Sequence, residues 1–298
     1  MLSTTVSASL NYQTTLVKGT EIFTVDQYDD VGWKTMVNLN STPSDWFEGD
    51  TNFTGAQSKV TIKGWNDVTW ETYDVFISLF MAEHFNFSDI IILLGIMDTL
   101  GYNETTINAN YTNSYNLWYG LRAVWNFTIT DFEDQPSYND GVRIFKNPLD
   151  LKAILDDYNT LVMELNGKIP IQFAGYNFPI LNADEFLWQL AFDGLAIGKP
   201  QSEYLIDLIN ELGCENVTAS GSTLTINRHG ETDYTVVISY GEKGTLSSLS
   251  VKDVDENIVF RIVSTNSEWI FYIILIVIAV CGVILVAYII IKKRKPKI

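Results

Sequence analysis

The last 30 residues of the chain contain the feature that most constrains its fold, an apolar run followed by a basic tail. Residues 269–291 are 23 consecutive residues without a charge. A helix of this length rises about 34 Å, enough to cross a hydrocarbon core of about 30 Å. Trp269, Tyr272 and Tyr288 lie towards its ends, where aromatic rings favour the headgroup region. We therefore predict a transmembrane helix over 267–291 in preference to a buried core helix.

The charges that follow this run predict its orientation. Lys292, Lys293, Arg294 and Lys295 come directly after the apolar residues, and we expect them to anchor the helix at the membrane interface. Because basic flanks resist translocation, the tail 292–298 is predicted to lie in the cytoplasm. The preceding residues are then expected outside, which predicts a single-pass protein of the plasma membrane.

The first residues carry only part of an export signal. The opening "MLSTTVSASLNY" has neither a basic segment nor a long apolar one, but Val6-Ser7-Ala8 fits the small-x-small pattern before a signal-peptidase cut. We interpret 1–8 as the remnant of a signal peptide that starts upstream, with the mature chain beginning near Ser9. The alternative is a flexible N-terminus on a tail-anchored protein, which the basic tail argues against.

Acceptor sites for N-glycosylation support an external domain. Seven asparagines match N-x-[ST], about twice the number expected by chance from the chain's composition. Six of the seven fall between residues 40 and 126. The candidates are Asn40, Asn52, Asn86, Asn103, Asn110, Asn126 and Asn216.

The charge of the chain limits which partners it can bind, and its cysteine content shows whether disulfides are expected. Without the tail, the chain has 14 basic and 36 acidic residues, a net charge of −22 that disfavours binding to nucleic acid. With 47% hydrophobic residues the chain has enough apolar surface for a core. Cys281 lies in the predicted span and Cys214 does not, so no disulfide is expected in the external domain. Cys214 is interpreted as a buried apolar residue, with an intermolecular bridge as the alternative.

Residues 9–146 are expected to be mainly β, with one helix. In "SKVTIKGW" the apolar Val60 and Ile62 alternate with polar residues, and "ETYDVFISLF" is read as a second strand. The segment 88–101 is expected to be helical because Ser88 or Asp89 fits a cap and Gly101 fits an end. A strand is expected over 115–130, followed by a polar connector, "DFEDQPSYNDG".

Residues 147–266 are expected to be helices followed by a four-stranded antiparallel meander, within the same domain or as a second one. Apolar residues recur at steps of three and four from Leu151 to Leu165, with Asn147 as the expected cap and Gly167 at the end. Further helices are predicted near 183–196 and 202–212. From Ser222 the apolar residues alternate, with short polar connections. The predicted fold class is therefore α+β, with antiparallel sheets and amphipathic helices packed on them.

One short motif resembles an enzyme signature. Arg228-His229-Gly230-Glu231 is similar to the active-site sequence of the histidine phosphatase and phosphoglycerate mutase family, in which the histidine accepts a phosphoryl group. Here it stands between two alternating strands, and no histidine follows it. We therefore predict a hairpin turn, and no enzyme activity.

Other candidate sites are weaker. Asp253, Asp255 and Asn257 have the spacing of a calcium loop, but Ile258 stands where glycine is needed, so a turn is expected. Calcium is an alternative for a second acidic cluster; no other cofactor is expected. Six tryptophans are expected mostly to fill a core, with sugar stacking as the alternative. The acidic cluster is Asp131, Glu133, Asp134 and Asp140, and the tryptophans are Trp33, Trp46, Trp65, Trp70, Trp118 and Trp125.

The overall layout resembles single-span surface proteins of archaea, of Asgard lineages in particular. The residues that carry this likeness are "GTEIFTVDQYDD", "DWFEGD", the acidic sequon-rich domain and the Trp-bordered span followed by "KKRK". The resemblance implies a cell-surface location. We expect a non-enzymatic, membrane-anchored domain that binds a protein, a glycan or the cell envelope. The alternative is a solute- or carbohydrate-binding domain that acts with a separate transporter or receptor.

Overall fold

A computed structural model describes residues 11–81, 87–169 and 178–265, which form an α+β fold with one curled antiparallel sheet. The sheet has the strand order β4-β3-β2-β1-β9-β8-β7-β6-β5. Its strands are β1 (Gly19–Tyr28), β2 (Gln57–Glu71), β3 (Ser114–Thr128), β4 (Tyr138–Phe145), β5 (Val217–Ser220), β6 (Thr223–His229), β7 (Asp233–Tyr240), β8 (Leu246–Lys252) and β9 (Ile258–Thr265).

Two meanders meet at the centre of this sheet. Strands β1 to β4 pair in sequence order, and so do β5 to β9. The two halves join where β1 pairs antiparallel with β9, for example Phe23 with Ser264 and Val25 with Ile262. The four-stranded meander predicted from Ser222 onward is confirmed as β6 to β9, and the structure adds β5 at its edge. One sheet therefore replaces the several sheets that we expected.

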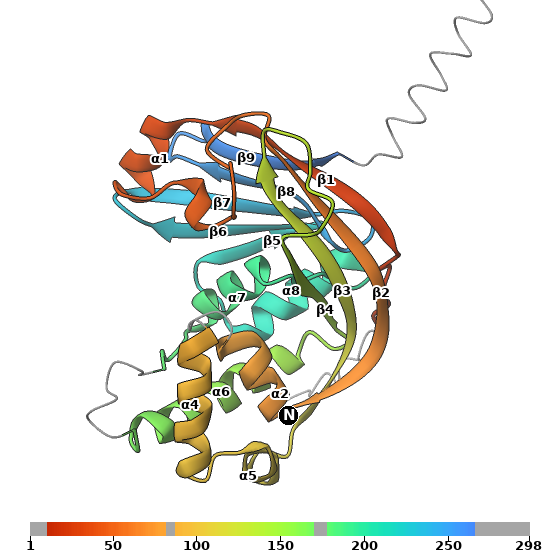
Figure 1. The fold of residues 1–298 in the computed structure, drawn as a ribbon, viewed down its shortest axis with the longest axis vertical. Coiled ribbons are helices and arrows are strands. Elements are labelled where there is room, and N and C mark those ends of the chain that lie inside the picture. The colour runs from red at the N-terminus through yellow and green to blue at the C-terminus, as the bar shows by residue number, and fades with distance from the viewer. Residues whose placement is uncertain (1–10, 82–86, 170–177, 266–298) are drawn as a thin grey trace, which may run out of the picture.

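The helices of the second half follow the predicted periodicity. Helix α6 (Asp150–Asn166) buries every residue of its three-and-four pattern, from Leu151 to Leu165. Helix α8 (Gln201–Leu212) packs against β5, β6 and α6, and α7 (Ala183–Phe192) lies beside it inside the curl (Figure 1). Asn147 does not cap α6 as expected: Leu149 holds the cap position, and the Asn147 Oδ1 accepts a hydrogen bond from its N–H.

The remaining helices come from the first half of the chain. They are α1 (Asp30–Met36), η1 (Pro43–Asp45), α2 (Thr72–Val75), the π-helical turn η2 (Phe76–Met81), α4 (Phe87–Thr99) and α5 (Glu104–Asn110). Helices α7 and α8 lie inside the curl, α2, α4, α5 and α6 lie below it, and α1 lies at its upper end (Figure 1). The helix expected over 88–101 is confirmed as α4. Short capped helices such as α1 and α5 were not predicted, because they contain too few turns to show a period.

The strand predicted over 71–80 is wrong. That segment continues from β2 into α2 and η2. Thr72, Val75, Phe76 and Leu79 are all buried, and their spacing of three and four is that of a helix face. Glu71 and Asp74 form a reciprocal capping box that begins the helix. The alternation of Tyr73, Val75, Ile77 and Leu79 that favoured a strand is therefore coincidental.

The polar connector predicted before residue 142 is also partly wrong. Its last four residues, 138–141, are the first residues of β4 and pair with Leu121 to Val124 of β3. The side chains of Tyr138 and Asp140 face inward despite their polarity, and this made the start of β4 look like a loop.

A single contiguous core joins both halves of the chain. Its buried members run from Tyr12 to Ile262 and include Trp33, Tyr158, Tyr204 and Phe260. Within residues 11–81, 87–169 and 178–265, no helix is long and apolar enough to cross a membrane. The predicted transmembrane helix, its interface residues Trp269, Tyr272, Tyr288 and Lys292 to Lys295, and the remnant signal peptide at 1–8 lie outside the described residues.

Candidate functional site

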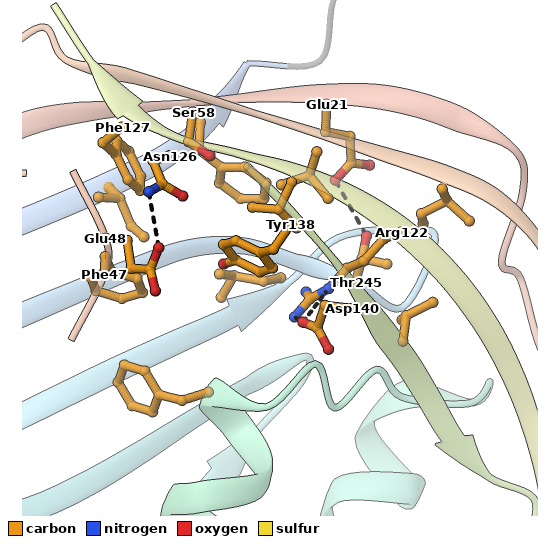
Figure 2. A pocket seen from close by; sticks show the side chains of 18 of the residues that line it. Glu21, Phe47, Glu48, Ser58, Arg122, Asn126, Phe127, Tyr138, Asp140 and Thr245 are labelled. Atoms are coloured by element: carbon orange, nitrogen blue, oxygen red, sulfur yellow. Dashed lines mark hydrogen bonds and ion pairs between the residues drawn. The ribbon is translucent and has the colours of Figure 1, made fainter. Parts of the chain in front are cut away.

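The inner face of the curled sheet encloses a cavity of about 510 Å³ that is partly open to solvent (Figure 2). It lies against β1, β2, β3, β4 and β9, and is bounded by the segment 46–48, the end of α7 and the turn between β7 and β8. Its volume falls within the range of about 300 to 1,000 Å³ that is typical of small-molecule sites.

Strand alternation places the lining side chains on one face. Arg122, Val124 and Asn126 of β3 stand beside Asp140 and Tyr138 of β4, because Arg122 pairs with Asp140 and Val124 with Tyr138. Register shifts in β1 and β2, at 25–27, 57–59 and 62–64, mark irregularities that increase twist and bend a strand. These shifts accompany the curl of the sheet (Figure 1). The cavity lies on the inner face of this curl.

A glycine fixes one end of the cavity. Gly49 has a φ of 99°, and a Cβ there would come within 2.1 Å of the Phe127 carbonyl oxygen. The backbone of 48–50 therefore lies directly against β3, with the Phe127 N–H donating to the Glu48 carbonyl at 3.0 Å. This contact sets Phe47 and Glu48 at the edge of the cavity, next to Asn126 and Phe127 (Figure 2).

Charged and polar side chains of the cavity are mostly paired with one another. The Arg122 guanidinium donates to the Asp140 carboxylate, and Lys243 lies 3.4 Å from a Glu21 carboxylate oxygen. The Asn126 Nδ2 donates to Glu48 Oε2 at 2.9 Å. In Figure 2, Asn126 and Glu48 lie on one side of Tyr138, and Arg122, Asp140 and Glu21 lie on the other. We call these sets the two polar groups of the cavity.

A buried ion pair holds α7 against β4 beside the cavity. Arg143 is 6% exposed, and its guanidinium donates to both the backbone oxygen and the carboxylate of Asp193. The backbone of Arg143 also exchanges hydrogen bonds with Gly194 and Ala196, so this segment covers the free edge of β4. Asp193 and Phe192 reach the cavity from this point.

An aromatic cluster forms the wall near α7. The ring of Trp46 lies 4.7 Å from that of Trp33, 5.2 Å from that of Trp188 and 5.7 Å from that of Phe192, in edge-to-face contacts. Trp33 is fully buried, whereas Trp46 is half-buried and lines the cavity. Of the six tryptophans of the first half, Trp70 and Trp118 pack against the core, and Trp65 is 38% exposed.

The structure brings one sequon asparagine into the cavity, Asn126. The side chains of Asn40, Asn52, Asn103, Asn110 and Asn216 are exposed, and Asn86 lies outside the described residues. Asn103 caps α5, and the Asn216 Nδ2 donates to Asp184 at 2.9 Å. The seven sequons stay predicted acceptor sites, and Asn126 differs from the five exposed ones by lining the cavity.

The Arg-His-Gly-Glu motif is a hairpin, as predicted. His229 ends β6, Asp233 begins β7, and both side chains are more than three-quarters exposed. Arg228 lies over the Trp188 ring at 4.5 Å. A Cβ at Gly230 would come within 2.2 Å of the Val37 carbonyl oxygen, so the turn packs closely on the end of α1.

The two acidic sequences considered for calcium have other partners. The Asp253 carboxylate accepts hydrogen bonds from the N–H groups of Asp255 and Asn257, as expected of a turn. Asp140 faces the cavity and pairs with Arg122. The other three acids of the cluster, Asp131, Glu133 and Asp134, are not part of the cavity lining. No group of three metal-ligating side chains occurs among the described residues.

Sequence reasoning missed most residues of this cavity. A signal was present: Arg122 and Asn126 occupy inward positions of β3, on the same side as Val124. Polar residues at inward positions of a strand indicate a site, but the sequence alone does not show which face of the strand is inward.

Comparison with protein-family models, with curated proteins and with solved structures finds no match to this chain.

Proposed function

We propose that this chain is a membrane-anchored surface protein whose external domain binds a small molecule inside the curl of its sheet. The observation that carries the proposal is the cavity of about 510 Å³, lined by strands from both halves of the sheet. A concave, mostly apolar space with a few converging polar groups is the usual form of a small-molecule site. This favours the solute-binding alternative over a domain that recognises partners through a flat face.

The lining supports binding rather than catalysis. It contains neither histidine nor cysteine, and its serine hydroxyl, Ser58 Oγ, donates to the Trp125 carbonyl at 2.7 Å. His229, the residue of the phosphatase-like motif, is exposed in a hairpin and is not part of the lining. The acids Glu21 and Asp140 are paired with Lys243 and Arg122.

The experiment compares what purifies with the full chain and with two variants. Val124→Trp places a large side chain in the cavity, and Val124 is buried without belonging to the contiguous core. Leu121→Trp is the matched control, because Leu121 is 53% exposed and lies on the same strand outside the lining. Each protein is purified in lipid nanodiscs, and its bound small molecules are extracted and identified by mass spectrometry.

We expect a compound that accompanies the parent chain and Leu121→Trp, and whose amount falls at least tenfold in Val124→Trp. Circular dichroism verifies that both variants are folded. Equal amounts of every extracted compound in all three folded proteins would show that the cavity is not the binding site.

A further inference from the structure

We propose that the ligand of this cavity is the hydrocarbon chain of an amphiphile with one small polar head, rather than a sugar. This inference rests on the proposed function and names the class of molecule that the site takes. It follows from three features: a floor of apolar side chains, polar groups that are mostly paired with one another, and the Tyr138 hydroxyl, which makes no hydrogen bond to a described residue.

The floor of the cavity is made of side chains without polar atoms. They come from β1, β2, β3, β4 and β9, and most are branched aliphatic residues. Water in such a space has few hydrogen-bond partners, and apolar cavities bind apolar molecules for this reason. The floor residues are Phe23, Val60, Ile62, Val124, Val142 and Ile262.

The polar groups of the lining have few positions left for a sugar. Lys63 donates to the Asn139 Oδ1 at 2.7 Å, and the Ser58 hydroxyl donates to a backbone carbonyl. Arg122 and Glu21 are engaged with Asp140 and Lys243, and the Asn126 Nδ2 is engaged with Glu48. The Asn126 Oδ1 is a buried acceptor without a partner among the described residues, so it leaves one position for a donor. A sugar carries a hydroxyl on most of its carbons, and hydroxyls buried without partners lose affinity. A hydrocarbon chain has no hydroxyl groups that need hydrogen-bond partners.

The aromatic rings also argue against sugar stacking. Trp46 presents its ring to Trp33, Trp188 and Phe192 in edge-to-face contacts, and Phe47 stacks on Phe260 at 6.1 Å. These rings form part of the wall and are held by their neighbours. They provide apolar contact for a chain more readily than an open platform for a sugar ring.

Tyr138 supplies a position for one polar head. Its side chain lies in the middle of the cavity between the two polar groups (Figure 2). Tyr138 is 40% exposed, so its hydroxyl lies at the open side of the cavity, and it makes no hydrogen bond to another residue that the structure describes. A phenol is protonated at neutral pH and can donate a hydrogen bond. Desolvation raises the pKa of this phenol further, against the opposing effect of Arg122.

The chain could come from the bilayer or from solution. Ile262 of the floor lies on β9, five residues before the start of the predicted transmembrane helix at residue 267. An extended chain covers at most about 3.6 Å per residue, so the sheet would stand close to the membrane. A membrane lipid and a free amphiphile would present the same hydrocarbon to the cavity.

The test uses photoreactive probes on the full chain in nanodiscs. One probe is a long-chain alcohol with a diazirine on its chain, a second is a phospholipid with the diazirine on one acyl chain, and a third is a diazirine-bearing disaccharide. After illumination, the labelled positions are mapped by peptide mass spectrometry. We expect the alcohol or the phospholipid to label strands β2 and β3 at cavity residues such as Val60, Val124 and Phe127.

Labelling at these positions should fall at least fivefold in Val124→Trp and stay unchanged in Leu121→Trp. Labelling by the alcohol alone would assign a free amphiphile, and labelling by the phospholipid would assign a membrane source. Cavity labelling by the disaccharide and not by either chain would overturn the hydrocarbon assignment and keep the proposed small-molecule site. No cavity labelling by any probe would overturn the assignment, and it would overturn the proposed function too if the extraction experiment also finds no cavity-dependent compound. Mapping the parent chain gives this answer even if Val124→Trp does not fold.

Discussion

The side chains of Asn126 and Glu48 meet at one end of the cavity, with the Asn126 Nδ2 2.9 Å from the Glu48 Oε2. The same nitrogen is the atom that N-glycosylation would modify. A glycan on Asn126 would displace Glu48 and occupy the cavity from within. We therefore expect this sequon to stay unmodified in the folded protein, unlike the exposed Asn40 and Asn52.

Glycopeptide mapping of protein from its native host checks this expectation. Thr128→Ala removes the sequon while leaving Asn126 in place, so the mass of glycan attached to the protein should not change. Asn52→Gln is the comparison, since Asn52 is exposed and outside the lining. A loss of glycan mass on Thr128→Ala would show that Asn126 is used, and would also exclude ligand binding in that glycoform.

Two neighbours in the hairpin should respond very differently to substitution. His229→Asn should change the free energy of unfolding by less than about 0.5 kcal/mol, because His229 is 76% exposed. Gly230→Ala places a Cβ within 2.2 Å of the Val37 carbonyl oxygen, and such overpacking costs about 1–3 kcal/mol. Denaturant unfolding measures both. A destabilisation by His229→Asn equal to that of Gly230→Ala would contradict the surface-turn interpretation.

An element could be predicted from the sequence where its signal is local. The meander of β6 to β9 and helix α6 were predictable because each carries its own period over enough residues. The pairing of β1 with β9 joins residues about 240 apart in the chain, and no local pattern encodes it. Residues 72–79 partly fit both the strand period of two and the helical period of 3.6, and it is the burial of Thr72 and Phe76 in the structure that identifies the helix face. The cavity required both the curl and the β1–β9 pairing, so its residues could not be assembled from sequence alone.

The ion pair between Arg143 and Asp193 should contribute strongly to the attachment of α7. Arg143→Met removes the cation that neutralises a largely buried carboxylate, and losses of this kind cost about 3–5 kcal/mol. Arg261→Met is the matched control, since its pair with Asp26 has a distance of 3.6 Å and is 40% and 50% exposed. An exposed pair contributes roughly 0–1 kcal/mol. Chemical denaturation measures the free energy of unfolding of both variants. Equal losses would show that the buried pair stabilises the protein no more than the exposed pair does.

Cys214 should react slowly with thiol reagents in the native protein. Desolvation first, and then the neighbouring Asp184, raise the pKa of its thiol to about 12. Because the reactive thiolate is scarce below that value, alkylation at pH 8 should be at least tenfold slower than in urea. The sign of the shift means that the thiol's contribution to stability is complete below its unfolded pKa and is lost as the pH rises towards 12. Cys214, predicted to be buried, is only partly buried and packs against the core. Mass spectrometry of its peptide separates it from Cys281, and rapid native labelling would contradict a protected thiol.

The proposed membrane anchoring and orientation of the chain can be tested with an epitope tag placed after Ile298. The basic residues Lys292 to Lys295 predict that the tag is cytoplasmic, and the sequons predict that residues 11–265 are outside. Protease added to intact cells should therefore shorten the tagged protein to fragments that keep the span and tail, and lysis should be needed before the tag itself is lost. Because β9 ends at Thr265 and the predicted transmembrane helix begins at residue 267, cuts are expected in loops of the domain rather than between the two. Loss of the tag from intact cells together with a protected domain would reverse the orientation, and would place the cavity on the cytoplasmic side of the bilayer.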